Sequence, residues 1–109
     1  MFGLFKVKNL EIIKPEQVEE LLRRKGLKVL DVRTPMEYKM GHIAGAINMD
    51  ITDKSFAEKV GKLNKSTPYL IYCRSGVKSM SAARYMSKQG FEEMYNLKGG
   101  YIAYSGKFY

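Results

Sequence analysis

The feature that most constrains the fold is an uninterrupted apolar run, Tyr69–Tyr72, which stands between two segments with helical spacing. Apolar residues recur three or four positions apart in both segments: Phe56, Val60 and Leu63 before the run, and Met80, Ala83 and Met86 after it. A strand that is apolar at every position is typical of a central strand in a parallel sheet, because helices cover both of its faces. The pattern therefore predicts an α/β fold, with helices on both faces of a mostly parallel sheet.

The rest of the chain continues this alternation of short strands and helices. Further strands are predicted at Leu10–Ile13, 28–32, 46–49 and Met94–Leu97. One helix is predicted from Pro15 to the residues before Gly26, and a second after a cap at Thr52 or Asp53. A third helix is predicted at 79–90, and a fourth after a glycine turn at Gly99 and Gly100. A loop that contains Gly41 and Gly45 joins the strands at 28–32 and 46–49. Because no linker or repeat interrupts the pattern, residues 1–109 are expected to form one domain, with residues 1–9 as an N-terminal extension.

The net charge limits the classes of partner. Nineteen Lys and Arg against eleven Asp and Glu give +8, which favours anionic partners such as small oxyanions or acidic protein surfaces. The basic residues are scattered, and the longest basic run covers only residues 23–25, so no nucleic-acid binding is expected. The apolar residues 1–5 are far fewer than the roughly 20 that span a bilayer. We expect no membrane association, and predict that this segment packs on the domain or on a partner.

The position of the only cysteine, Cys73, suggests a chemical role. It directly follows the apolar run, at the end of a strand where α/β folds bind ligands. A cysteine reacts as the thiolate, so a nucleophilic Cys73 needs surroundings that stabilise negative charge. With no second cysteine, no intrachain disulfide can form, and a reducing cytoplasm is the expected location.

The loop after the cysteine is suited to stabilising a thiolate. It consists of Arg74, Ser75, Gly76, Val77, Lys78 and Ser79. The glycine permits a turn with positive φ, so that successive backbone N–H groups can surround the sulfur, while the cations and hydroxyls add to the positive field. The alternative is that Cys73 is a small apolar residue that ends a buried strand. An inert cysteine needs neither a glycine turn nor two flanking cations, so the loop favours the nucleophile.

Three blocks of the sequence resemble the single-domain rhodaneses, a family of sulfurtransferases. The first, "LDVRTPMEYKMGHIAGAINM" at 30–49, is similar to the family's D-V-R, P-x-E and G-H-I-x-G-A-x-N signature. The second, "IYCRSGVKSMSAARYM" at 71–86, resembles the active-site cysteine with its six-residue loop and following helix. The third, "LKGGYIAY" at 97–104, resembles the closing L-x-G-G motif. The resemblance implies the three-layer rhodanese-like fold.

The resemblance also implies a reaction. Cys73 would take a sulfane sulfur from a donor such as thiosulfate, become a persulfide, and pass the sulfur to cyanide or a thiol. The backbone of residues 74–78 would cradle the persulfide, and no metal or organic cofactor is implied. We expect a monomer whose partners are a small anionic sulfur donor and a thiol or cyanide acceptor, with an acidic sulfur-relay protein as a further partner.

Four charged or titratable residues of the first block are candidates for a supporting role. Asp31 and Arg33 lie on one side of the pleat at a strand end, where they can face the cysteine loop. Arg33 could contact an anionic donor or form an ion pair with Glu37, and the ion pair is the simpler interpretation. Asp31 is expected to accept hydrogen bonds from backbone groups. His42, the only histidine, is expected to be structural, although Cys–His pairing can activate a thiol.

Two other functions fit parts of the pattern. A persulfide carrier fed by a protein donor would use the same cysteine chemistry, and the +8 charge would help it dock on acidic surfaces. A phosphatase of the same fold is disfavoured, because tyrosine phosphatases place an arginine after cysteine and five residues, where this chain has Ser79. Arg84 falls within the predicted helix, too far along to close the loop.

Overall fold

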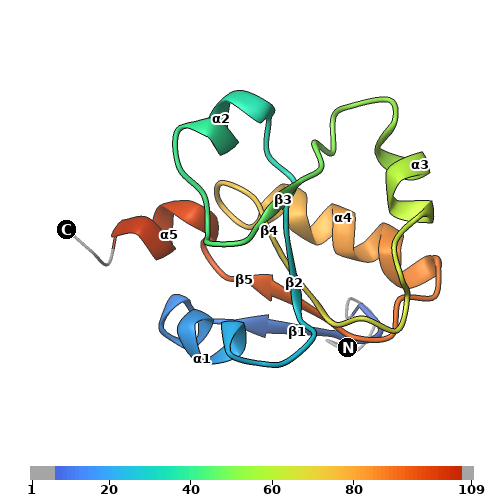
Figure 1. Ribbon diagram of the computed structural model, residues 1–109, viewed down its shortest axis with the longest axis horizontal. Coiled ribbons are helices and arrows are strands. Elements are labelled where there is room, and N and C mark those ends of the chain that lie inside the picture. Colours follow the sequence, from blue (N-terminus) through green and yellow to red (C-terminus); the bar gives the residue numbers. More distant parts are fainter. Residues whose placement is uncertain (1–6, 107–109) are drawn as a thin grey trace, which may run out of the picture.

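The sheet contains five parallel strands in the order β1-β5-β4-β2-β3 in the computed structural model, which describes residues 7–106 (Figure 1). The strands are β1 (Leu10–Ile13), β2 (Lys28–Asp31), β3 (Ile47–Asn48), β4 (Tyr69–Tyr72) and β5 (Met94–Leu97). All four residues of β4 are buried, and the strand occupies the centre of the sheet. The predicted parallel α/β fold is confirmed. The apolar segment at residues 1–5 lies outside the described residues, so its predicted packing stays a prediction.

Helices cover both faces of the sheet. They are α1 (Val18–Leu22), which follows a 3-10 turn η2 (Pro15–Gln17), and α2 (Pro35–Lys39), α3 (Phe56–Gly61), α4 (Val77–Lys88) and α5 (Gly100–Gly106). Figure 1 shows α3 and α4 on one side of the sheet, and α1 and α5 on the other. Accordingly, Leu30 and Ile71 pack in one core cluster with residues of α3 and α4, whereas Val29 and Leu70 pack in a second cluster with Val18 of α1. Within residues 7–106, no helix is long and apolar enough to cross a bilayer.

The helix α2 was not predicted, since the sequence indicated only a loop between β2 and β3. Its start is defined by a capping box: Thr34 Oγ1 accepts from the Glu37 amide at 3.3 Å, and Glu37 Oε1 accepts from the Thr34 amide at 3.2 Å. Pro35 occupies the first helical position, where its missing N–H costs nothing. None of the residues of α2 is buried, which explains why no core-facing apolar pattern indicated a helix.

Two helix starts also differ from the predictions. Neither Thr52 nor Asp53 is the N-cap of α3, because Asp53 instead accepts hydrogen bonds from the amide and hydroxyl of Ser55, the residue directly before the helix. The next helix, α4, begins at Val77, two residues earlier than predicted. It does so because the left-handed conformation of Gly76, with φ of 98°, completes the turn after Cys73 within three residues.

The start of α5 packs directly on the loop that follows β4. The amides of Tyr101 and Ile102 donate to the carbonyl oxygens of Cys73 at 2.8 Å and Arg74 at 3.1 Å. This approach is possible because residue 100 is glycine: a Cβ there would lie 2.6 Å from the Cys73 carbonyl oxygen and would overlap the Arg74 carbonyl. The L-x-G-G motif therefore joins the last helix to the cysteine loop.

We predict that Gly100→Ala destabilises the protein more than Gly26→Ala does. Both glycines have positive φ, but a Cβ at Gly26 would have no atom within 4 Å. Gly26→Ala should therefore lower the free energy of unfolding only by the left-handed backbone penalty of about 1–2 kcal/mol, whereas overpacking raises the cost at Gly100 to about 2–5 kcal/mol. Urea unfolding of both variants measures this difference, and equal losses would show that the close approach is not rigid.

Candidate active site

The sulfur of Cys73 lies in a cradle of hydrogen-bond donors at the carboxyl end of β4. Cys73 is 3% exposed. Its Sγ accepts hydrogen bonds from the backbone amides of Gly76 at 3.1 Å and Ser79 at 3.3 Å, and the Ser79 hydroxyl lies 3.3 Å away. These donors come from the turn at Gly76 and from the first turn of α4. The cradle is suited to holding a negative charge on the sulfur.

The surroundings of Cys73 have opposing effects on its pKa. Burial raises the pKa of the thiol, because it disfavours the charged thiolate. Hydrogen bonds from the hydroxyl and amide of Ser79 and from the amides of Gly76 and Ser75 lower it, and together they prevail, so that the pKa of Cys73 lies below its ordinary value. A larger fraction of Cys73 is therefore thiolate at neutral pH than in an unperturbed cysteine.

The predicted loop residues contribute in different ways. Gly76 and Ser79 bond the sulfur directly, and Ser79 is fully buried. Arg74, Ser75, Val77 and Lys78 are exposed. Within residues 7–106, neither cationic side chain donates a hydrogen bond to the sulfur, and the hydrogen bonds that lower the pKa of Cys73 come from Ser75, Gly76 and Ser79.

A residue that sequence reasoning missed, Asn96 of β5, completes the site. Its side chain is buried, its Oδ1 lies 2.5 Å from Ser79 Oγ, and its Nδ2 donates to the Gly76 carbonyl at 3.3 Å. The only signal in the sequence was a polar residue among the apolar and aromatic residues of a predicted strand. Asn96 thus fixes both the hydroxyl and the turn that surround the cysteine.

The hydroxyl of Ser79 has one hydrogen and two neighbouring acceptors. In the thiol form, the Cys73 S–H donates to Ser79 Oγ, and the hydroxyl donates to Asn96 Oδ1. In the thiolate form the same hydrogen is needed by the sulfur, which leaves Asn96 Oδ1 without its donor. Since an unsatisfied buried acceptor is costly, Asn96 favours the neutral thiol.

Asp31 and Arg33 do not face the cysteine loop as expected: they form a buried ion pair that bonds Tyr72, in the core cluster on the opposite face of the sheet from Cys73. Arg33 Nε and Nη2 donate to the Asp31 carboxylate at distances down to 2.6 Å, and Nη2 also donates to the Gly41 carbonyl at 2.7 Å. Asp31 accepts a further bond from the Tyr72 hydroxyl at 2.7 Å. The guanidinium lies over the Tyr101 ring, 4.4 Å from its centre. The pair therefore joins β2, β4 and α5.

The predicted partner of Arg33 was wrong. Arg33 pairs with Asp31, while Glu37 caps α2 through Thr34. Asp31 accepts from the Arg33 backbone amide at 2.9 Å, as expected of it, but also from two side chains. His42 is exposed and contacts Tyr38: its Nδ1 lies 2.7 Å from the Tyr38 carbonyl oxygen, and its ring stacks on the Tyr38 ring.

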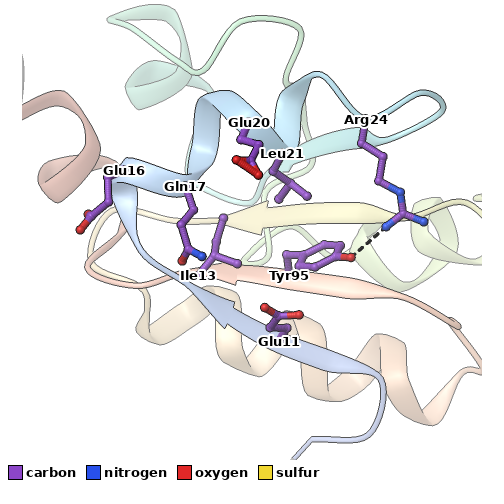
Figure 2. A pocket seen from close by; sticks show the side chains of 8 residues that line it. All are labelled: Glu11, Ile13, Glu16, Gln17, Glu20, Leu21, Arg24 and Tyr95. Carbon is purple, nitrogen blue, oxygen red and sulfur yellow. Dashed lines mark hydrogen bonds between the residues drawn. The ribbon is translucent and has the colours of Figure 1, made fainter.

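A surface pocket between β1 and α1 offers a contrasting environment (Figure 2). Its lining consists of Glu11, Ile13, Glu16, Gln17, Glu20, Leu21, Arg24 and Tyr95. Figure 2 shows Arg24 bonded to the Tyr95 hydroxyl, and Arg24 also pairs with Glu93. Three carboxylates in this pocket repel anions, so the cysteine loop is the better candidate for an anionic substrate.

A parallel α/β domain with its only cysteine in a backbone anion cradle is the class of protein that the fold and the site define. The family model described as "Rhodanese-like domain" matches residues 14–107. The chain belongs to the rhodanese-like domain family, and its similarity to named sulfurtransferases supports a transferase of that type.

Individual relatives agree with this family. The thiosulfate sulfurtransferase GlpE of Pseudomonas putida is 38% identical over 82% of this chain and 79% of its own length. The tRNA uridine(34) hydroxylase of Pelagibacter ubique is 33% identical over 84% of this chain, but over only 31% of its own length. The crystal structure of a rhodanese-related protein from Thermoplasma volcanium matches with a TM-score of 0.78 and 29% identity, covering 91% of this chain and 94% of that one.

We predict that Ser79→Ala raises the pKa of Cys73 and that Asn96→Val lowers it. The first change removes a donor to the thiolate, and the second removes the acceptor that competes for the same hydrogen. The measurement is the alkylation rate of Cys73 against pH. In the double variant Asn96→Val should have no effect on the pKa, because the shared hydrogen is gone; an equal effect in both backgrounds would contradict the competition.

We predict that Arg33→Met lowers the free energy of unfolding by about 3–5 kcal/mol, because it leaves the buried Asp31 carboxylate without its partner. The double variant Asp31→Asn/Arg33→Met should recover most of this loss, since no buried charge remains and the amide oxygen still accepts from Tyr72. Urea unfolding measures both. A single variant as stable as the unmodified protein would show that the pair is unimportant for folding.

Proposed function

We propose that the protein is a sulfurtransferase in which Cys73 carries a sulfane sulfur as a persulfide. The observation that supports this proposal is the cradle itself: amides of Gly76 and Ser79 converge on the sulfur and lower the pKa of the thiol. A persulfide is also an anion, so the same donors suit both the thiolate before transfer and the loaded form after it. The similarity to thiosulfate sulfurtransferases gives the class of reaction.

The reaction proceeds in two displacements. The Cys73 thiolate attacks the sulfane sulfur of thiosulfate, the S–S bond of the donor breaks, and sulfite leaves with the bonding electron pair. An acceptor then attacks the outer sulfur of the persulfide: cyanide becomes thiocyanate, or a thiolate becomes a persulfide, and the Cys73 thiolate is restored. Neither step needs an external oxidant or reductant. The exposed cations Arg74 and Lys78 attract the anionic donor toward the loop.

A phosphatase activity is not favoured by the site. The position where tyrosine phosphatases carry an arginine is Ser79, which is buried and bonds the sulfur and Asn96. Arg84 is exposed on α4, away from the loop.

The proposed sulfur transfer requires Cys73 in its reduced form, which a reducing compartment such as the cytoplasm maintains.

We predict that thiosulfate adds the mass of one sulfur atom to the reduced protein and that cyanide removes it. Because Cys73 is the only cysteine, the gain is assigned without ambiguity, and Cys73→Ala should show none. Intact mass spectrometry before and after each reagent measures both steps. A gain in the variant, or turnover of a generic aryl phosphate in place of sulfur transfer, would overturn the proposal.

A further inference from the structure

The exposed apolar side chains are concentrated near the carboxyl ends of the strands, where Cys73 lies. Six large apolar residues within 7–106 are well exposed, and four of them lie in segments that follow β2, β4 and β5. These four are Met36 of α2, Met40 directly after α2, Val77 of α4 and Ile102 of α5, which are 73%, 86%, 71% and 52% exposed. The other two, Ile12 and Ile47, lie on the edge strands β1 and β3.

The topology gathers these segments around Cys73. The strands β5, β4 and β2 are neighbours in a parallel sheet, so the segments that follow them all begin at the carboxyl ends of the strands (Figure 1). Ile102 bonds the Arg74 carbonyl through its amide, which places α5 against the loop. At the end of α2, a Cβ on Gly41 would lie 2.9 Å from the Tyr101 hydroxyl, so α2 in turn borders α5.

Met36 of α2 and Met40, the C-cap residue of this helix, form an exposed apolar face. Met36 and Met40 are one turn apart and therefore lie on the same side of the helix. Methionine is flexible and polarizable, which suits it to contacts with a partner of irregular shape. A small anion such as thiosulfate gains nothing from such a surface. The surface therefore indicates a macromolecular partner.

The charge and depth of the site define the chemistry of that partner. Lys39, Arg74 and Lys78 are exposed on the same segments, so an acidic surface is complementary to them. Because the sulfur of Cys73 is recessed in its loop, an acceptor or donor sulfur has to enter on a projecting group. An anionic lipid surface would satisfy the charge and the apolar contacts, but it carries no sulfur to exchange.

We propose that Met36, Met40, Val77 and Ile102 form a docking surface for an acidic protein that presents a cysteine on a protruding loop. This inference rests on the proposed persulfide function. The partner's thiolate attacks the outer sulfur of the Cys73 persulfide, the S–S bond breaks, and Cys73 leaves as the thiolate. The partner cysteine gains the sulfur, its thiol proton passes to solvent, and the reverse direction loads Cys73.

The test compares acceptors of different size and charge. The protein is loaded with thiosulfate, and loss of the extra sulfur is followed by mass spectrometry with three acceptors. The first is free cysteine, and the second is a cyclic peptide that carries cysteine between leucine and aspartate. The third is the same peptide with its cysteine kept, but with serine in place of leucine and lysine in place of aspartate. The acidic apolar peptide should react at least about tenfold faster than free cysteine, and added salt should reduce this advantage. The basic peptide should show no advantage.

Surface variants assign the advantage to α2. Met36→Ser/Met40→Ser should abolish the advantage of the acidic peptide and leave the rate with free cysteine unchanged, whereas Ile12→Ser, an exposed apolar residue on β1, should leave both rates unchanged. Equal rates for both peptides, or equal advantage in the double variant, would overturn the docking surface. If the unmodified protein binds anionic phospholipid vesicles and Met36→Ser/Met40→Ser does not, the surface is assigned to lipid instead. This result would also overturn the proposed protein-docking surface.

A binding measurement separates this inference from the proposed function. If thiosulfate fails to load Cys73, the proposed function fails, but the unloaded protein can still be titrated with a fluorescent acidic peptide in which serine replaces cysteine. Fluorescence anisotropy should then show binding by the unmodified protein and by Ile12→Ser, and weaker binding by Met36→Ser/Met40→Ser. Equal binding by all three proteins would overturn the docking surface independently of any sulfur chemistry.

Discussion

The hydrogen bonds from the start of α5 to the cysteine loop are the interaction on which the site depends. They engage the carbonyl oxygens of Cys73 and Arg74, which directs these acceptors away from the sulfur and toward the last helix. The amides of Gly76 and Ser79 are then free to point at the sulfur. A loop that turned its carbonyls inward would repel a thiolate. The last helix therefore sets the polarity of a site to which it contributes no side-chain bond among the described residues.

The last residue of β4, Tyr72, and the residue after it, Cys73, point to opposite faces of the sheet and have separate roles. Cys73 belongs to the cluster packed against α3 and α4, where its sulfur lies against Ser79, which in turn bonds Asn96. Tyr72 belongs to the opposite cluster, where its hydroxyl donates to Asp31 and accepts from the Ile43 amide. Burial and the bond to Asp31 raise the pKa of Tyr72, so its proton stays in place. The ion-pair network thus fixes the strand that carries the nucleophile without contacting the sulfur.

The sequence predicted what depends on local pattern and missed what depends on distant partners. The bounds of β1, β4 and β5 followed from short segments rich in apolar residues, and the turn at Gly76 followed from its place after a strand. The helix α2 was missed because it buries no residue, although its capping box was a readable signal. The partner of Arg33 was wrong because a spacing of four implies contact only inside a helix, and Arg33 precedes one. Asn96 was missed because its partner Ser79 lies in another element, 17 positions away.

The burial of Cys73 also prevents two copies of the protein from forming a disulfide with each other. A disulfide between two copies would require their Cα atoms to approach within about 7 Å, with the two sulfurs in direct contact. With Cys73 only 3% exposed and enclosed by its own loop and α5, two folded copies would collide before their sulfurs met. The lone thiol is therefore shielded from oxidative dimerisation while it stays open to small or projecting reagents. The same recess that selects its reaction partners keeps the nucleophile in its working form.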